Sequence, residues 1–421
     1  MRTLKLITLS VAAATAGFAA NAMAGGFAIG IQSGSATGNA VAGGAAVAED
    51  ASVVWSNPAG MMHLASPRQV TVGLNVFKPS FKFENTGSTG LFALPGTGEG
   101  GDGGDWAYVP NAFGTYEINP RLRVGLALNV PFGLVTSYDQ GWRGQLTALK
   151  SKIETININP AVAFKINDMF SVGAGVSVQR LKAELSSFSG VAALGNANLA
   201  ADDTAWGWNV GLTFQPLQQL RFGATYRSAI DYSLDGDVRF TGVAGGPFGG
   251  NVRADLKVPD SASFSVLYAL NPKWELMGDI TWTGWDHLQQ LVVTRTTTSA
   301  GGAAGSTFTT LPFNWKDTWR YSVGASYRVN DAFKLRFGFA FDETPTNDTT
   351  RTPRLPDQDR KWVAFGVQYR APWKGVFEIG YAHEFIRDAS VNVSVPPAPG
   401  ALIGRFENKA DILSVQYSHP F

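Results

Sequence analysis

The sequence predicts an all-β fold: a closed antiparallel transmembrane β-barrel of about fourteen strands, with an N-terminal plug in its lumen. Three observations lead to this prediction. Segments with an apolar residue at every second position recur along the 421 residues. The connections between them alternate between short turns and long loops. The chain also ends on an aromatic residue, Phe421, at the end of such a segment. This combination is typical of barrels in the bacterial outer membrane.

The chain begins with the features of a secretory signal peptide over residues 1–24. Arg2 and Lys5 give a charged start, an apolar stretch follows over residues 6–20, and Ala22-Met23-Ala24 is a small-x-small cleavage site. After this stretch the sequence has no run of about 18 apolar residues that would form a transmembrane helix. An exported chain of this kind can cross a membrane only as closed sheet, because lipid cannot satisfy open backbone groups.

The composition narrows the function classes. Charged residues make up 16% of the chain and hydrophobic residues 45%, whereas soluble proteins carry about 25% charged residues. The lack of cysteine excludes disulfides and thiol chemistry. A net charge of +1 argues against a nucleic-acid partner. The 4 histidines show no metal-ligand spacing, so we expect neither a metal nor another cofactor.

Residues 25–66 differ from the rest because Gly, Ala and Ser dominate them, as in Gly43-Gly44-Ala45-Ala46. Such residues can pack closely but offer little surface to lipid. We interpret this stretch as a compact plug inside the lumen. A disordered export leader would have the same composition and stays open as the alternative.

Residues 67–421 form the predicted barrel. Phe337 and Phe339 share an apolar face of one strand, while Arg336 and Gly338 lie between them, as expected for lipid on one side and a polar lumen on the other. Short turns near residues 120, 168, 217, 272, 331 and 372 alternate with long stretches at 85–104, 138–148, 187–204, 239–254, 296–311, 345–360 and 392–406. A soluble β-sandwich is the alternative, but it explains this alternation poorly.

Several short motifs occur along the chain in a characteristic order and spacing. They are Ala48-Glu49-Asp50-Ala51, Asn57-Pro58-Ala59-Gly60, Pro131-Phe132-Gly133-Leu134, Tyr226-Arg227-Ser228, Trp282-Thr283-Gly284-Trp285, Phe341-Asp342-Glu343-Thr344-Pro345 and the stretch 351–360. Together with the plug-like leader and the terminal Phe, they make the mature chain resemble the FadL-type long-chain fatty acid transporters of the outer membrane. The resemblance implies a barrel closed by an N-terminal hatch, from which hydrophobic ligand leaves sideways through the wall.

Two of these motifs have alternative interpretations. Pro131 and Gly133 flank Phe132 in a strand that otherwise alternates cleanly; proline cannot donate to a ladder and glycine often marks a bulge. We interpret them as an inward kink that opens the wall, with an ordinary strand end as the alternative. Asn57-Pro58-Ala59-Gly60 is either a local turn or, by the resemblance, a hatch element beside that opening.

The residues leave two classes of ligand open. In the fatty-acid members of the family, a basic pair and a hydroxyl hold the carboxylate, and the resemblance matches those positions with Leu185, Leu311 and Val130 here. An apolar set of this kind favours an uncharged hydrocarbon of the toluene or xylene type.

Basic residues elsewhere in the chain support a fatty acid as the ligand. Lys316 and Arg320 lie opposite the lipid-facing Trp319, so we expect both in the lumen. There they could bind a ligand carboxylate, or they could pair with lumenal acids such as Asp279 and Glu378.

Arg180 and Lys182 share the parity of the lipid-facing Val178. We therefore expect them on the outer face, near lipopolysaccharide phosphates above the aromatic girdle. Other expected partners are outer-membrane lipids and the barrel-assembly machinery, because a terminal residue such as Phe421 is part of the insertion signal in this class of protein.

An enzymatic function finds little support in the sequence. No Gly-x-Ser-x-Gly motif occurs, and His383-Glu384, the nearest hint of a lipid-hydrolysing outer-membrane enzyme, shares the lipid-facing parity of Tyr381. We expect no catalysis. The sequence and the resemblance together predict a channel in the cell outer membrane of a Gram-negative bacterium. It would take up hydrophobic molecules passively, with fatty acids as the first candidate and hydrocarbons as the alternative.

Overall fold

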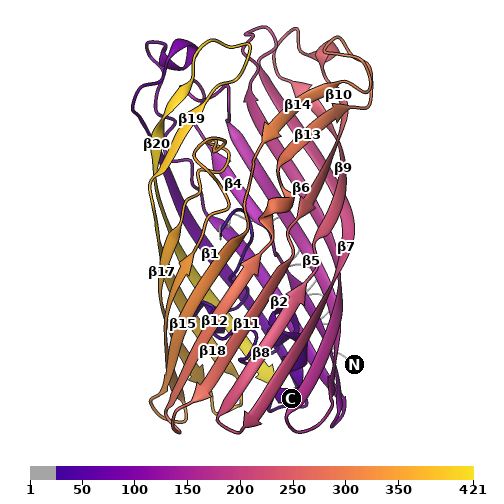
Figure 1. Cartoon of the computed structure of the whole chain (residues 1–421), viewed down its shortest axis with the longest axis vertical. Coiled ribbons are helices and arrows are strands. Elements are labelled where there is room, and N and C mark those ends of the chain that lie inside the picture. The colour runs from indigo at the N-terminus through magenta and orange to yellow at the C-terminus, as the bar shows by residue number, and fades with distance from the viewer. Residues whose placement is uncertain (1–24) are drawn as a thin grey trace.

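The computed structural model describes residues 25–421, so the signal peptide predicted at residues 1–24 lies outside the described part of the chain. Figure 1 shows a tall closed barrel with short turns at one end and long loops at the other. All strands belong to one antiparallel sheet whose 20 segments make 14 wall strands, because several strands are interrupted. The predicted fold is confirmed. In residues 25–421, no helix is long and apolar enough to cross a membrane.

The strands follow one another around the wall in chain order. The unbroken ones are β1 (Arg68–Asn85), β2 (Ala107–Asn119), β5 (Lys150–Lys165), β6 (Phe170–Phe188), β7 (Asn196–Leu217), β16 (Phe333–Asp342), β17 (Arg360–Arg370) and β20 (Leu402–Pro420). The interrupted ones are β3 (Leu122–Asn129) with β4 (Gly133–Ser137), β8 (Leu220–Arg227) with β9 (Ile230–Phe240), β10 (Gly250–Val258) with β11 (Ser261–Ala269), β12 (Trp274–Thr283) with β13 (Gln290–Arg295), β14 (Thr307–Pro312) with β15 (Thr318–Arg328) and β18 (Val376–Ile386) with β19 (Ala389–Val393). Pairing of β1 with β20 closes the sheet.

The outer face of the wall carries the apolar and aromatic side chains that the alternation predicted. On β17, Val363 and Phe365 are exposed, whereas Trp362 and Ala364 are buried on the inner side. Near the end with the short turns, rings follow one another with centroids 4.8 to 6.5 Å apart, in the order Phe333, Tyr369, Phe377, Tyr417, His419 and Phe421. Such a row suits the boundary between lipid and water, where amphipathic rings are favoured.

The connections confirm the predicted alternation. Short turns join β2 to β3, β5 to β6, β7 to β8, β11 to β12, β15 to β16 and β17 to β18. Long loops cover residues 86–106, 138–149, 189–195, 241–249, 296–306, 343–359 and 394–401, and they include the 3-10 helices η2 (Gly90–Ala93) and η3 (Gly246–Phe248). Phe421 lies at the end with the short turns, where its N–H donates to the carbonyl oxygen of Arg68 at 3.0 Å.

Residues 25–66, called the hatch from here on, lie inside the barrel (Figure 1). They contain α2 (Gly34–Gly38), α3 (Val53–Ser56) and the 3-10 helix η1 (Pro58–His63). Helix α2 packs against β17, β18 and β20, and η1 packs against β5, β6 and β7. Glycine in the wall permits this close approach, since a Cβ at Gly338 would come within 2.1 Å of the carbonyl carbon of Asn39.

Buried ion pairs fix the middle of the hatch to the wall. The carboxylate of Glu49 accepts from Lys334 at 3.0 Å and from Arg336 at 2.6 Å, and Arg336 also pairs with Glu378 of β18 at 2.7 Å. Burial alone would raise the pKa of Glu49, but the two cations hold it well below its usual range. Removing one partner would leave a buried charge uncompensated, which is strongly destabilising. This part of the hatch is therefore firmly attached to β16.

Candidate functional site

The third wall strand is interrupted by Val130, Pro131 and Phe132, between β3 and β4. Segment β3 pairs with β2 on one side and with β5 on the other. Segment β4 pairs with β5, but within residues 25–421 it has no pairing with β2. Proline has no N–H to donate, so a continuous ladder cannot run through this point. The wall thus has an opening between β2 and β4 where backbone hydrogen bonds are missing.

The start of the hatch takes the place of a neighbouring strand on the inner side of this kink. The N–H of Ile29 donates to the carbonyl oxygen of Pro131 at 2.7 Å, and the N–H of Gly133 donates to that of Phe27 at 2.9 Å. These two bonds have the pattern of a short antiparallel ladder. The kink is therefore stabilised by a segment that is not itself part of the wall.

Side chains satisfy the other polar groups of the kink. The amide of Gln32 donates to the carbonyl oxygen of Val130 at 2.9 Å. The hydroxyl of Thr155, on β5, accepts from the N–H of Phe132 at 3.0 Å and donates to its carbonyl oxygen at 2.7 Å. Buried backbone groups require such partners. Movement of residues 27–32 would therefore expose part of the kink but leave Phe132 bonded to β5.

Apolar side chains of the hatch cover the inner side of the opening. Ile29 and Ile31 are buried in one cluster with Val109 of β2 and Val130 of the kink. At the level of the kink, the opening is thus closed by apolar side chains in place of a hydrogen-bonded ladder.

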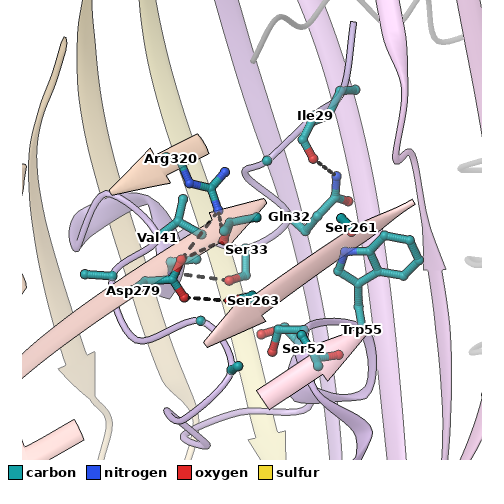
Figure 2. A pocket seen from close by; sticks show the side chains of 18 of the residues that line it. Ile29, Gln32, Ser33, Val41, Ser52, Trp55, Ser261, Ser263, Asp279 and Arg320 are labelled. Atoms are coloured by element: carbon teal, nitrogen blue, oxygen red, sulfur yellow. Dashed lines mark hydrogen bonds and ion pairs between the residues drawn. The ribbon is translucent and has the colours of Figure 1, made fainter. Parts of the chain in front are cut away.

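A cavity of about 230 Å³ lies between the hatch and the wall and reaches the kink at Pro131 and Phe132. Two rows of residues line it side by side across β8, β11, β12 and β15. One row is Arg227, Ser261, Thr283 and Thr318, and the other is Thr225, Ser263, Thr281 and Arg320. Figure 2 shows Arg320 with Asp279 on one side of this cavity and Trp55 near Ser261 on the other.

Four neighbouring strands are interrupted at the level of this cavity, at residues 228–229, 259–260, 284–289 and 313–317. The third interruption holds the 3-10 helix η4 (Trp285–His287). The ring of Trp285 lies 4.9 Å from Phe27 and from Trp315, and 6.5 Å from Phe132. Rings from two interrupted strands thus meet rings from the hatch and the kink, and they close the lumen on the loop side of the cavity.

Arg320 is partly compensated by an acid. Its guanidinium donates to the hydroxyl of Thr281 at 3.2 Å and lies 3.9 Å from the carboxylate of Asp279. Its buried Nε has no hydrogen-bond partner among the described residues. Because this atom is buried, a ligand in the cavity would meet Arg320 through its terminal nitrogens, which already contact Thr281 and Asp279.

Comparison with known proteins decides the family. The family described as outer membrane protein transport protein (OMPP1/FadL/TodX) matches residues 15–421. The chain belongs to this family. A putative outer membrane protein of Neisseria meningitidis serogroup B is 31% identical over 97% of each chain. The long-chain fatty acid transport protein of Escherichia coli strain K12 is 26% identical over 92% of this chain and 90% of its own.

Solved structures agree with this assignment. The crystal structure of a Pseudomonas aeruginosa FadL homologue covers 94% of this chain and 100% of its own, with a TM-score of 0.84 at 27% identity. The Pseudomonas putida toluene transporter TodX covers 88% and 94%, with a TM-score of 0.68 at 18% identity, which is a likeness in fold alone. The resemblance noted in the sequence is confirmed, and this FadL-type chain is an outer-membrane protein.

The structure separates the three apolar residues that were predicted for the ligand pocket. Val130 lies in the kink. Leu185 lies near the loop end of β6, and Leu311 on β14 packs beside a cluster in the upper lumen. Neither leucine lines the cavity described above. Alternation indicates which side of the wall a residue faces but not its height, so contact of Leu185 and Leu311 with a ligand stays a prediction.

The basic residues also differ in their placement. Arg320 lines the cavity, whereas Lys316 is exposed in the interruption before β15, where its N–H donates to the carbonyl oxygen of Pro345 at 3.2 Å. The alternation that predicted both in the lumen does not hold for Lys316, because residues 313–317 are not strand. Arg180 and Lys182 are exposed on β6, and Arg180 pairs with Asp202 at 2.8 Å. Their contact with lipopolysaccharide stays a prediction.

The motif Asn57-Pro58-Ala59-Gly60 forms the start of η1. The Asn57 side chain accepts from the N–H of Ala59 at 3.1 Å and donates to the carbonyl oxygens of Ala45 at 2.7 Å and Leu212 at 3.0 Å. The motif is thus a capped turn held against β7, and the hatch residues that bond to the kink are 27–32 instead. Its role in transport stays a prediction.

His63 ends η1 near the end of the barrel with the short turns, where its Nε2 lies 2.8 Å from the hydroxyl of Thr213. Burial lowers the pKa of His63 to about 3, with a further contribution from the nearby charges of Arg221, Lys165 and Arg123. The imidazole is therefore neutral at physiological pH.

His383 lies on the outer wall together with the exposed Tyr381, as its parity predicted. Its Nδ1 and the hydroxyl of Tyr381 both contact the carboxylate of Asp411, at 2.8 Å and 2.6 Å. His383 thus has a structural partner on the outer face of the wall, on the side away from the cavity.

Proposed function

We propose that this chain is a passive outer-membrane channel for hydrophobic molecules, which leave its lumen sideways through the opening between β2 and β4. The observation that carries the proposal is the construction of the wall there. A ladder is missing between β2 and β4, and apolar side chains of the hatch fill its place. An apolar molecule can cross such a boundary without breaking the hydrogen bonds of the barrel.

A sideways exit suits the physical chemistry of such a ligand. Each methylene moved from an apolar place into water costs about 0.8 kcal/mol, so about ten methylenes cost about 8 kcal/mol. Passage from the cavity into the lipid of the outer leaflet avoids most of this cost. A route through the periplasmic end would not, because water meets the chain there.

Long-chain fatty acids are the first candidate ligand. A relative that matches over most of its length is named a long-chain fatty acid transport protein, and arginine side chains line the cavity here. Aromatic or aliphatic hydrocarbons are the second candidate, favoured by the apolar Val130, Leu185 and Leu311. The proposal includes no catalytic step, and its partners are membrane lipids and the hydrophobic ligand.

The test replaces Pro131 and Gly133 together by valine, so that a continuous strand can form beside β2. Uptake of radiolabelled oleate and of toluene is measured in cells, and heat-modifiable gel mobility reports barrel folding. The matched control is Gly114→Val, since a side chain added at Gly114 of β2 meets nothing within 4 Å. We expect the double variant to fold but to lose uptake, whereas the control keeps it. A folded double variant with normal uptake would refute the sideways exit.

A further inference from the structure

One partly buried cation that lines the cavity has no ion pair within residues 25–421. Arg227, the last residue of β8, lies with its guanidinium carbon 3.3 Å from the centre of the Trp55 ring. It donates to the carbonyl oxygen of Trp55 at 2.8 Å and to the hydroxyl of Ser177 at 3.2 Å, and both partners are neutral. A partly buried charge of this kind would be stabilised by an anionic partner.

The other arginines that line the cavity are compensated. Arg320 has Asp279 at 3.9 Å, and Arg336 has two acids, Glu49 at 2.6 Å and Glu378 at 2.7 Å. The cavity lining also includes the acids Asp50 and Asp342, so Arg227, beside Trp55, is distinguished by its lack of an ion pair within residues 25–421 and not by a positive charge of the whole cavity.

Arg227 also belongs to a row of hydroxyl groups. It lies directly opposite Ser261 of β11, which lies opposite Thr283 of β12, which lies opposite Thr318 of β15. All four line the cavity, and within the described chain the three hydroxyls have no hydrogen-bond partner. The neighbouring row, by contrast, ends at Arg320 and Asp342. The row of Arg227 contains no acid, and the guanidinium of Arg227 reaches away from its hydroxyls, across β7 to Ser177 on β6.

Resting on the function proposed above, we propose that Arg227 binds the carboxylate of a long-chain monocarboxylate in this cavity. Charge-assisted hydrogen bonds from a guanidinium hold a carboxylate strongly. A hydrocarbon would gain nothing from this group. The site therefore favours a charged amphiphile over an uncharged hydrocarbon as the ligand.

The rest of the cavity gives the ligand a direction. Two apolar residues of the hatch, Val41 and Ile29 (Figure 2), line the same cavity as Phe132 of the kink. With the carboxylate at Arg227, the hydrocarbon tail points toward the opening between β2 and β4. The tail then enters the membrane first, and the carboxylate leaves the protein last.

The experiment compares two ligands of equal length on the purified full-length protein, oleate and oleyl alcohol. Arg227→Gln should weaken oleate binding by about tenfold to a hundredfold and change oleyl alcohol by less than about twofold. The control is Arg221→Gln on the same strand, which also contacts the hatch, through the carbonyl oxygen of Ala46 at 3.3 Å, but does not line the cavity. The control should bind both ligands normally.

The other outcomes overturn the proposal. Equal losses for both ligands in Arg227→Gln would show that Arg227 only anchors the hatch, and an unchanged oleate affinity would place the carboxylate elsewhere. If Arg227→Gln does not fold, Arg227→Lys keeps the charge but replaces the planar fork stacked on Trp55 by an ammonium, and it should weaken oleate alone by several-fold. Unchanged oleate binding in that variant also refutes the site. A wild-type protein that binds neither ligand refutes the proposed function itself.

Discussion

A disulfide across the kink should close the channel reversibly. Ala28 of the hatch and Phe132 of the kink face each other in an antiparallel bridge, and the two bonds flanking them make this a non-hydrogen-bonded pair. In such a pair the Cα atoms lie about 4.5 Å apart, within the range that a disulfide spans. The chain has no cysteine of its own (Cys 0), so Ala28→Cys with Phe132→Cys can form only the intended bond.

Hydrogen bonds between the hatch and the kink contribute to the free energy that keeps the opening closed. Three hydrogen bonds connect residues 27–32 to the kink, those of Ile29 with Pro131, Gly133 with Phe27 and Gln32 with Val130. At about 0.5–1.5 kcal/mol each, they amount to about 1.5–4.5 kcal/mol. These bonds alone limit the open form to between about 10⁻¹ and 10⁻³ of the molecules without ligand, and the burial of Phe27 and Ile29 lowers it further. A covalent bond removes this population entirely.

The assay is oleate uptake by cells that carry the double-cysteine variant, before and after a reductant. We expect at least a tenfold lower rate in the oxidised form and recovery after reduction. A disulfide that ties the hatch to the wall elsewhere is the control: the hydroxyls of Thr37 and Ser414 lie 2.7 Å apart, and Thr37→Cys with Ser414→Cys should leave uptake unchanged. Normal uptake through the oxidised Ala28/Phe132 variant would refute the idea that this segment must move.

Further predictions concern assembly, charge and pH. Deletion of Phe421, the last ring of the outer aromatic row, should reduce surface-exposed folded barrel far more than deletion of one residue from loop 296–306, as measured by heat-modifiable mobility and surface labelling. Lys316→Ala should leave oleate uptake unchanged because Lys316 lies outside the cavity, and a tenfold loss would place the carboxylate site there instead. Because burial holds the pKa of His63 at about 3 while the unfolded chain titrates near 6.5, the folded state binds fewer protons and its stability should fall as pH drops through this window. His63→Asn should lessen that fall in urea unfolding between pH 7 and pH 4, and an identical acid sensitivity in the variant would contradict the assignment.

Local sequence patterns predicted the wall because its two environments have a period of two. Phe365 and Trp362 illustrate this: one faces lipid and the other faces the lumen, and their parity alone separates them. The kink was predictable as well, because Pro131 removes a donor that a ladder needs.

The cavity was not predictable, because it depends on contacts between residues far apart in the chain. Arg227 and Trp55 meet only once the hatch is inside the barrel, and neither has a local pattern that indicates the other. Interruptions within strands were also not predictable from the sequence. Lys316 was expected in the lumen because alternation was assumed to continue through residues 313–317. These residues are not strand, so the alternation does not apply to Lys316. The motif Trp282-Thr283-Gly284-Trp285 was visible in the sequence, but its role in turning Trp285 into the lumen was not.

The central claim is that ligand leaves through the wall between β2 and β4. A fatty acid that carries a photoreactive diazirine near its tail tests this most directly, with the labelled residues identified by mass spectrometry after illumination of the protein in lipid. We predict labels at Val109 of β2 and at Phe132, on the two sides of the opening. Labels at Met62 and His63, near the end of the barrel with the short turns, and none at the opening would contradict the account.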